Sequence, residues 1–129
     1  QLKKLDSFVK RRKEIASKYD EAFFNSVVKP LYSFNQNSSY HLYVVKVDFS
    51  KLNISKIELF NKMREKNIGL QLHYIPINKQ PFYKNLGYGD EKTPIMNKYY
   101  DECFSLPMYS SLSNEEQEYV IKTLFEVLK

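Results

Sequence analysis

The stretch YHLYVVKVDF, residues 40–49, has the alternation of a β-strand with one mainly apolar face. The two faces would carry His41, Tyr43, Val45 and Val47 on one side, and Leu42, Val44 and Lys46 on the other. We expect Lys46 to face solvent or an edge of the sheet. Because such a strand needs cover on its apolar side, the stretch predicts a small sheet with helices packed on one face.

A helix is predicted shortly after this strand. Ser55 and Glu58 form an S-x-x-E capping box ahead of an apolar pattern with helical spacing, which predicts a helix over residues 56–66. Asn67 or Gly69 can supply the left-handed residue that ends the helix. The order of strand and helix favours a mixed fold.

Further strands and helices are predicted on both sides of this pair. The run GLQLHY predicts a strand over residues 69–75 that ends at Pro76, because proline cannot donate to a ladder. The run CFSLPMY predicts a strand over residues 103–107, and a short extended piece is expected at 27–32. Helices are expected over residues 2–24, 56–66, 94–102 and 114–128. The sequence therefore predicts one α+β domain with a small, mainly antiparallel sheet packed with helices.

The last two helices have recognisable starts and apolar stripes. Thr93 would cap the third helix, with Pro94 at its first position, and Ser113 and Glu116 form a second capping box. The expected inward stripes are Ile95, Met96, Tyr99, Tyr100 and Cys103 in the third helix, and Tyr119, Val120, Leu124, Val127 and Leu128 in the fourth.

Length and composition limit the class of protein. A chain of 129 residues suits one domain with a modest core, and the single cysteine, Cys103, cannot form an internal disulfide. No apolar run approaches the length of a membrane span. We therefore expect a soluble, cytoplasmic protein with no membrane partner. Since Gln1 stands where an initiator Met would and the amphipathic pattern already runs at Leu2, we also expect a piece of a longer chain.

The net charge of +5 is unevenly distributed and raises the question of nucleic-acid binding. Residues 1–89 have 16 Lys and Arg against 7 Asp and Glu, whereas residues 90–129 have 4 against 8. Much of the excess lies in the first predicted helix, where a solvated helix face is the ordinary interpretation. Only three basic residues are Arg, the side chain on which base recognition relies.

Few residues carry recognisable chemistry. The sequence has no phosphate-binding glycine loop, no C-x-x-C and no H-E-x-x-H motif. His41 and His73 would meet if their strands paired, but a metal site also needs a third ligand, so we expect no metal. Cys103 is expected to be a buried structural residue.

Four segments in order resemble a known family. They are QLKKLDSFVKRRKEIASKYD (1–20), SSYHLYVVKVD (38–48), NIGLQLHYIPINKQPFYKNLGY (67–88) and CFSLPMYSSLSNEEQEYVIKTL (103–124). Together they resemble the C-terminal part of the nucleotide-sugar aminotransferases of the DegT/DnrJ/EryC1/StrS family. The H-Y-I-P-I and Q-P-F-Y runs are most similar to the branch that aminates UDP-4-keto-6-deoxy-N-acetylaminosugars for pseudaminic acid.

The resemblance implies an enzyme that uses pyridoxal phosphate. It implies that residues 1–129 form the small C-terminal domain, and that the large domain upstream holds the cofactor, its Schiff-base lysine and every catalytic residue. It also implies amino transfer from an amino acid, usually glutamate, to a nucleotide-linked keto-sugar in cell-surface polysaccharide biosynthesis. Such proteins are usually homodimers.

The resemblance also suggests site residues. His73 and Tyr74 would lie near the active-site entrance and contact the substrate, with residues 76–83 on the sugar-nucleotide side. Asn78 and Lys79 stand where many relatives have a second histidine, so any role taken from that histidine is in doubt. The candidate substrate-binding residues are His41, His73, Tyr74 and Asn78. An open alternative is that His41 is structural and that the loop aromatics Tyr74, Phe82, Tyr83 and Tyr88 only pack the loop.

A second function class stays open as well. A sheet with exposed aromatics and lysine-rich flanks is typical of some RNA-binding modules. Against this alternative, the aromatic residues fall mostly in predicted loops and helix stripes, and Arg is scarce. We therefore expect no nucleic-acid partner.

Overall fold

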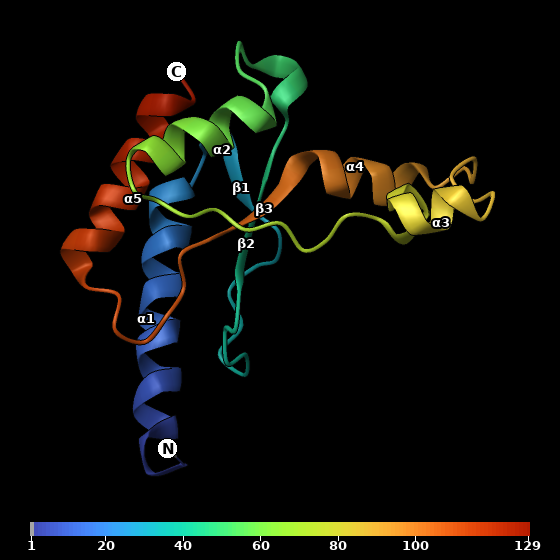
Figure 1. The fold of residues 1–129 in the computed structure, drawn as a ribbon. Coiled ribbons are helices and arrows are strands. Elements are labelled where there is room, and N and C mark those ends of the chain that lie inside the picture. Colours follow the sequence, from blue (N-terminus) through green and yellow to red (C-terminus); the bar gives the residue numbers. More distant parts are fainter. Residues whose placement is uncertain (1) are drawn as a thin grey trace.

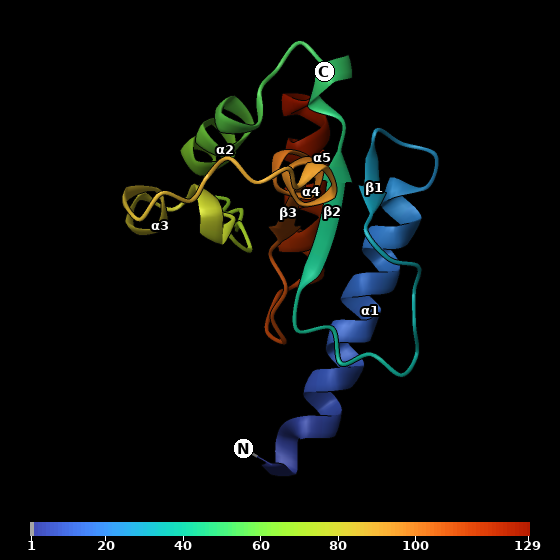
Figure 2. The same cartoon turned by 90° about the vertical axis from the view of Figure 1, so that its right-hand side faces the viewer.

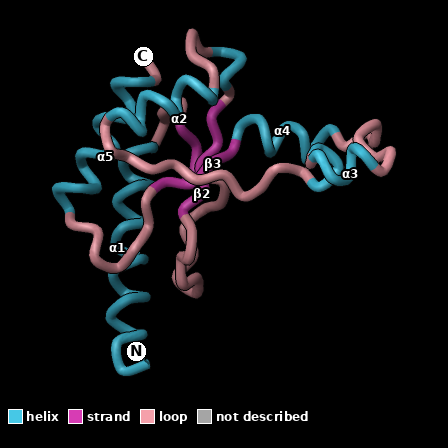
Figure 3. Tube along the Cα trace, viewed as in Figure 1, coloured by secondary structure: helices cyan, strands magenta, loops and turns pink. Residues whose placement is uncertain are grey.

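The computed structural model describes residues 2–129 and has one three-stranded antiparallel sheet in the order β1-β2-β3. The strands are β1 (Val28–Pro30), β2 (Tyr43–Val47) and β3 (Cys103–Leu106). In the register, Val28 lies opposite Val47, and Tyr43 lies opposite Leu106. Figure 3 shows these short strands at the centre of the molecule, with the helices around them. The predicted α+β class and antiparallel sheet are confirmed.

One predicted strand is wrong. Residues 69–75 make a single antiparallel bridge, in which the backbones of Gln71 and Ser105 exchange hydrogen bonds of 3.1 and 2.9 Å. On its other edge β3 pairs with β2 from Cys103 to Leu106, so the 69–75 run leaves the sheet after one bridge although β3 itself extends further. The third strand is instead β1, which was expected only as an extended piece.

The four predicted helices are confirmed within a few residues. They are α1 (Leu5–Phe23), α2 (Lys56–Glu65), α4 (Pro94–Glu102) and α5 (Asn114–Val127). A fifth, α3 (Pro81–Asn85), was not predicted, and short 3₁₀ turns lie at Leu2–Lys4, Phe49–Lys51 and Ile77–Lys79. In the described part of the chain, no helix has the length and apolar character needed to cross a membrane.

Local sequence fixes both ends of α2. The Ser55 Oγ accepts from the Glu58 backbone N–H at 3.2 Å, and the Glu58 carboxylate accepts from the Ser55 N–H at 2.8 Å. At the other end, Asn67 has a φ of 59°, and the Ile68 N–H donates to the Met63 carbonyl at 2.9 Å. These are the bonds of a Schellman C-cap. The predicted capping box and left-handed Asn67 are confirmed, and α5 opens with the same kind of box.

The core lies between one face of the sheet and helices α1, α2 and α5 (Figure 1). The face of β2 that bears Tyr43, Val45 and Val47 is buried, as predicted. All four residues of β3 are buried as well, because its second face is covered too. The largest buried side chains of this core include Ile15, Tyr19, Phe23, Leu59, Met63, Phe104, Leu112 and Leu124.

Helices α3 and α4 project away from this core as an arm (Figures 1 and 2). None of their residues is buried, and Ile95 is 87% exposed. The predicted inward stripe of α4 is therefore wrong, because α4 contacts the sheet only near its C-terminal end. Cys103 is buried as expected, but as the first residue of β3. The inward position predicted for Tyr119 is also wrong, since that side chain is 49% exposed.

Candidate functional site

His73 is held against the second face of β3. It follows the Gln71–Ser105 bridge by two residues, and its Nε2 lies 2.8 Å from the Ser105 Oγ. Ser105 alternates with Phe104 and Leu106, which face the core, so its hydroxyl lies on the opposite side of the sheet. Ser105 is only 2% exposed. The imidazole of His73 is thus anchored at one nitrogen to a rigid, buried strand.

The other ring nitrogen of His73 has different surroundings. Nδ1 is buried and has no hydrogen-bond partner among residues 2–129. His73 helps line a hollow of about 10 Å³, about the least space that holds one water molecule. The remaining lining residues are Val44, Leu72, Tyr74, Tyr99, Tyr100, Cys103 and Phe104. A buried polar atom beside a small hollow can bind one atom of a ligand.

Tyr74 stands next to this hollow and is 77% exposed. Its ring meets the His73 ring edge to face, with 5.2 Å between the ring centroids, and the peptide bond between the two residues is cis. Because most of the ring is in solvent, Tyr74 contributes little to the packing of this chain. This exposure argues against the alternative in which Tyr74 only packs the loop on the sheet.

Asn78 lies in the turn before α3 and belongs to a separate polar cluster. Its Nδ2 donates to the Glu91 carboxylate at 3.2 Å, while its Oδ1 is buried and has no partner among the described residues. The same carboxylate accepts from the Gly89 N–H at 2.8 Å. Backbone hydrogen bonds from Glu91 itself and Gly89, and the bond from Asn78, lower the pKa of Glu91. This cluster closes the loop between α3 and α4.

His41 lies apart from His73. Its side chain is exposed, it precedes the first residue of β2, and β3 separates β2 from the His73 segment. The two strands that would have brought the histidines together do not pair, so the two side chains do not meet. The His41 carbonyl, together with those of Tyr40 and Met108, accepts from the Arg12 guanidinium at 3.0 to 3.3 Å. In residues 2–129, no three His, Cys, Asp or Glu side chains gather closely enough to hold a metal ion.

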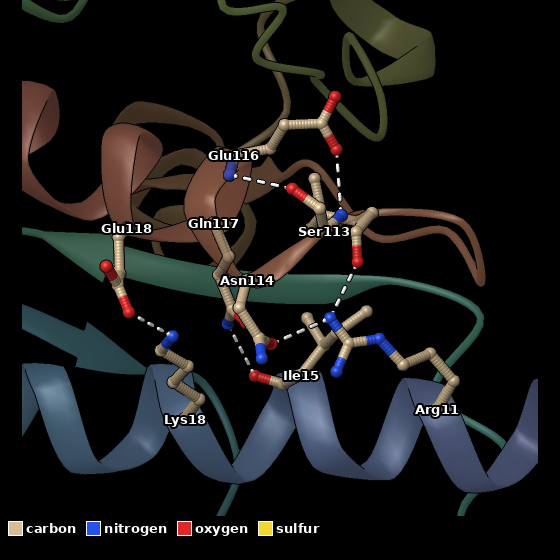
Figure 4. A network of polar contacts seen from close by, with 9 residues as sticks. Arg11, Ile15, Lys18, Ser113, Asn114, Glu116, Gln117 and Glu118 are labelled. Carbon is tan, nitrogen blue, oxygen red and sulfur yellow. Dashed lines mark hydrogen bonds and ion pairs between the residues drawn. The ribbon is translucent and has the colours of Figure 1, made fainter.

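Several cations of the basic helix α1 bind within the protein. Besides the Arg12 contacts, the Arg11 guanidinium donates to the Leu112 carbonyl at 2.6 Å and to Asn114 at 3.0 Å. Lys18 pairs with Glu118 of α5 at 2.6 Å (Figure 4). These basic side chains therefore hold α1 against α5 and the neighbouring loops. Because they are engaged within the protein, they argue against a nucleic-acid-binding role for this helix.

Lys56 is a candidate for the lysine that would hold pyridoxal phosphate. Its amine donates to the Tyr100 carbonyl and, at 2.8 Å, to the Cys103 carbonyl, and it lies 5.1 Å from the centre of the Tyr100 ring. Burial lowers the pKa of this amine. Because the Lys56 amine already donates hydrogen bonds to two carbonyls at the end of α4, it does not fit the role of the lysine that binds the cofactor. Lys56 therefore does not supply that site.

Two residues of the site were missed by the sequence analysis. Ser105 carries no motif, and its pairing with His73 depends on a contact between positions 32 residues apart. Glu91 lies after the loop of residues 76–83 and has no sequence signal of its own. A hydroxyl within an otherwise apolar strand, as in CFSL, is the only hint that Ser105 offers.

Comparisons with known proteins agree with this architecture. The sequence profile of the DegT/DnrJ/EryC1/StrS aminotransferase family matches residues 1–125. The spore coat polysaccharide biosynthesis protein SpsC of Bacillus subtilis is 35% identical over 133 residues, which are 100% of this chain and 34% of SpsC. The UDP-4-amino-4,6-dideoxy-N-acetyl-beta-L-altrosamine transaminase of Campylobacter jejuni is 34% identical, with coverage of 100% and 34%.

A solved structure shows the same fold. Spr1654 of Streptococcus pneumoniae, in its form with pyridoxal phosphate, superposes with a TM-score of 0.86 at 31% identity, over 98% of this chain and 33% of that one. Spr1654 is also known in a form with pyridoxamine phosphate, with a TM-score of 0.87. The chain spans about a third of the length of the relatives it matches. With its profile match over nearly every residue, the chain belongs to the DegT/DnrJ/EryC1/StrS aminotransferase family.

Proposed function

We propose that the protein containing this chain transfers an amino group from an amino acid, with glutamate as the proposed donor, to a keto-sugar linked to a nucleotide. Membership of the family supports this proposal, as does the name of the Campylobacter relative, a transaminase of a UDP-linked 4,6-dideoxy sugar. The H-Y-I-P-I run favours the same class of acceptor. The spore coat relative favours a place in cell-surface polysaccharide synthesis.

Pyridoxal phosphate, when bound, supplies the group that carries the amine between the two substrates. The forms in which Spr1654 is known support this cofactor. Because Lys56 does not fit the role of its lysine and the family resemblance implies a lysine in the large domain, we place the cofactor lysine outside residues 1–129. We further propose that these residues are the small domain of a cytoplasmic homodimer.

Within that protein, the residues of this chain bind and orient the sugar. The observation that carries this proposal is the state of His73, whose Nε2 is fixed by Ser105 while its buried Nδ1 lacks a partner in the described chain. Exposed Tyr74 lies beside it, and Asn78 lies further along the same loop. A nitrogen held in this way can hydrogen-bond one oxygen of a ligand.

The experiment is to replace His73 in the full-length protein and to follow the two half-reactions separately through the absorbance of the cofactor. The variants His73→Ala and His73→Asn should keep the resting cofactor spectrum and normal reaction with the amino donor. Reaction with the keto-sugar should lose about 5- to 150-fold in kcat/KM, because one hydrogen bond to a charged group is worth about 1–3 kcal/mol.

Lys122→Gln, an exposed change on α5, is the matched control and should leave both half-reactions unchanged. An equal loss in both half-reactions would instead give His73 a role in proton transfer. If the two His73 variants react with both substrates as the unmodified protein does, His73 has a structural role only.

A further inference from the structure

We propose that Ser105 is a positioning residue that fixes His73 in one tautomer, so that the Nδ1–H donates a hydrogen bond to an oxygen of the nucleotide-linked sugar. The identity of this ligand rests on the proposed function. The assignment of the tautomer rests on the geometry alone.

The argument begins with the hydroxyl of Ser105. A serine hydroxyl has one proton to donate, and a buried donor without an acceptor is unfavourable. Ser105 is 2% exposed, and within residues 2–129 its Oγ has one hydrogen-bond partner, the His73 Nε2 at 2.8 Å. The hydroxyl therefore donates its proton to Nε2.

The state of the ring follows from this direction. An Nε2 that accepts a hydrogen bond carries a lone pair, so in the neutral imidazole the proton lies on Nδ1. This nitrogen is then a donor, and its lack of a partner within the described chain leaves that donor unsatisfied. Buried donors of this kind generally have a partner in the functional state.

The hollow beside His73 limits what the partner can be. Its other walls are mostly aromatic and aliphatic side chains, so few polar groups of the chain itself line it. An acceptor oxygen, such as a keto, hydroxyl or phosphoryl oxygen, satisfies an Nδ1–H, whereas an ammonium group does not. A nucleotide-linked keto-sugar carries many such oxygens, and so do the carboxylates of an amino-acid donor, so the choice of the sugar rests on the proposed function.

The first test is the tautomer itself, read from the ring nitrogens by ¹⁵N NMR of histidine-labelled protein at alkaline pH, where imidazoles are neutral. The chain of 129 residues should show His73 with its proton on Nδ1, and His41 gives a second, internal signal. Ser105→Ala should shift His73 away from this tautomer, whereas Ser105→Thr, which keeps the hydroxyl, should retain it.

Thr123→Val is the matched control, because it removes another buried hydroxyl from α5, and it should leave the His73 signals unchanged. A proton on Nε2 in the unmodified chain would overturn the proposal. So would a His73 signal that is the same in Ser105→Ala.

The second test is kinetic and uses the full-length protein. Ser105→Ala should raise KM for the keto-sugar by about 3- to 10-fold, with no change in the half-reaction of the amino donor. If Ser105 acts through His73, the double variant Ser105→Ala/His73→Ala should be no worse than His73→Ala alone. Additive losses would overturn the positioning role.

The two tests also separate this inference from the proposed function. If His73→Ala reacts normally with the keto-sugar, the proposed function of His73 fails while the NMR result still decides the tautomer. If the proton of His73 lies on Nδ1 and the double variant is no worse than His73→Ala alone, the tautomer and the positioning role of Ser105 are both supported.

Discussion

At the scale of single residues, Asp48 is a carboxylate whose surroundings give a pH-dependent stability. Its side chain accepts from the Ser50 hydroxyl at 2.6 Å and the Ser50 N–H at 3.2 Å, and it pairs with Lys51 at 3.0 Å. These contacts, the Ser50 hydroxyl first, lower the pKa of Asp48 to about 2. The carboxylate thus caps the 3₁₀ turn after β2 in its charged form.

We expect Asp48→Asn to lower the free energy of unfolding at neutral pH. Because the folded pKa lies below the unfolded one, the stabilisation is complete above the ordinary pKa of about 3.9 and is lost as the pH falls toward 2. Urea titrations at several pH values should show the gap between the two proteins close over this range. Asp90→Asn, an exposed loop change, should produce no such closing gap, and a gap that persists at pH 2 would contradict the prediction.

At the scale of elements, α1 and α5 are joined by a buried amide. Gln117 is 0% exposed, and its Nε2 donates to the Ile15 carbonyl at 2.8 Å (Figure 4). Its Oε1 is buried and has no partner in the described part of the chain. Ile15 lies within α1, where its carbonyl also serves the helix. The Gln117 amide therefore donates one hydrogen bond to a carbonyl that already has a partner in the helix, and its own oxygen has no partner among the described residues.

We expect Gln117→Met to raise the free energy of unfolding by about 1 kcal/mol. The change removes an unsatisfied oxygen, worth about 1–3 kcal/mol, and loses one hydrogen bond worth about 0.5–1.5 kcal/mol, while nearly conserving volume. Urea unfolding monitored by circular dichroism measures it. Gln36→Met, in an exposed loop, is the matched control and should be neutral. A loss of stability in Gln117→Met would mean that Oε1 has a partner after all.

The helices were predictable because their signals are local. The capping boxes at Ser55 and Ser113, and Pro94 at the start of α4, lie within one turn of the ends that they define. Strand pairing depends on residues far apart in sequence, and the run at 69–75 has strand alternation but makes only one bridge to β3. The stripe of α4 has helical spacing, but periodicity does not say whether another element covers it.

At the scale of the whole molecule, the site lies where the closed core meets the projecting arm. His73 and Tyr74 were found by resemblance, whereas Ser105 was not, because only the folded chain brings β3 beside residue 73. Lys56 joins the two parts, since it extends from α2 to the carbonyls at the end of α4. The site residues are thus positioned by contacts between segments that sequence patterns treat separately.

The same arrangement predicts how this chain responds to pyridoxal phosphate. A stable covalent complex needs a lysine with an available amine, donors for the phosphate and an acid near the ring nitrogen. Lys56 is occupied by two carbonyls, and Lys46 and Lys18 pair with Glu102 and Glu118. We therefore expect the chain of 129 residues to form no stoichiometric adduct.

The measurement is to mix the chain with pyridoxal phosphate, reduce one portion with borohydride, dialyse both and map any modified lysine by mass spectrometry. The dialysed portion should keep no cofactor absorbance, and the reduced portion should show only low modification spread over exposed lysines. Lys56→Met is the matched variant and should behave identically, because the lysine it removes is not available to the cofactor. One lysine modified to completion would place the cofactor site within these residues and overturn its assignment to another part of the protein.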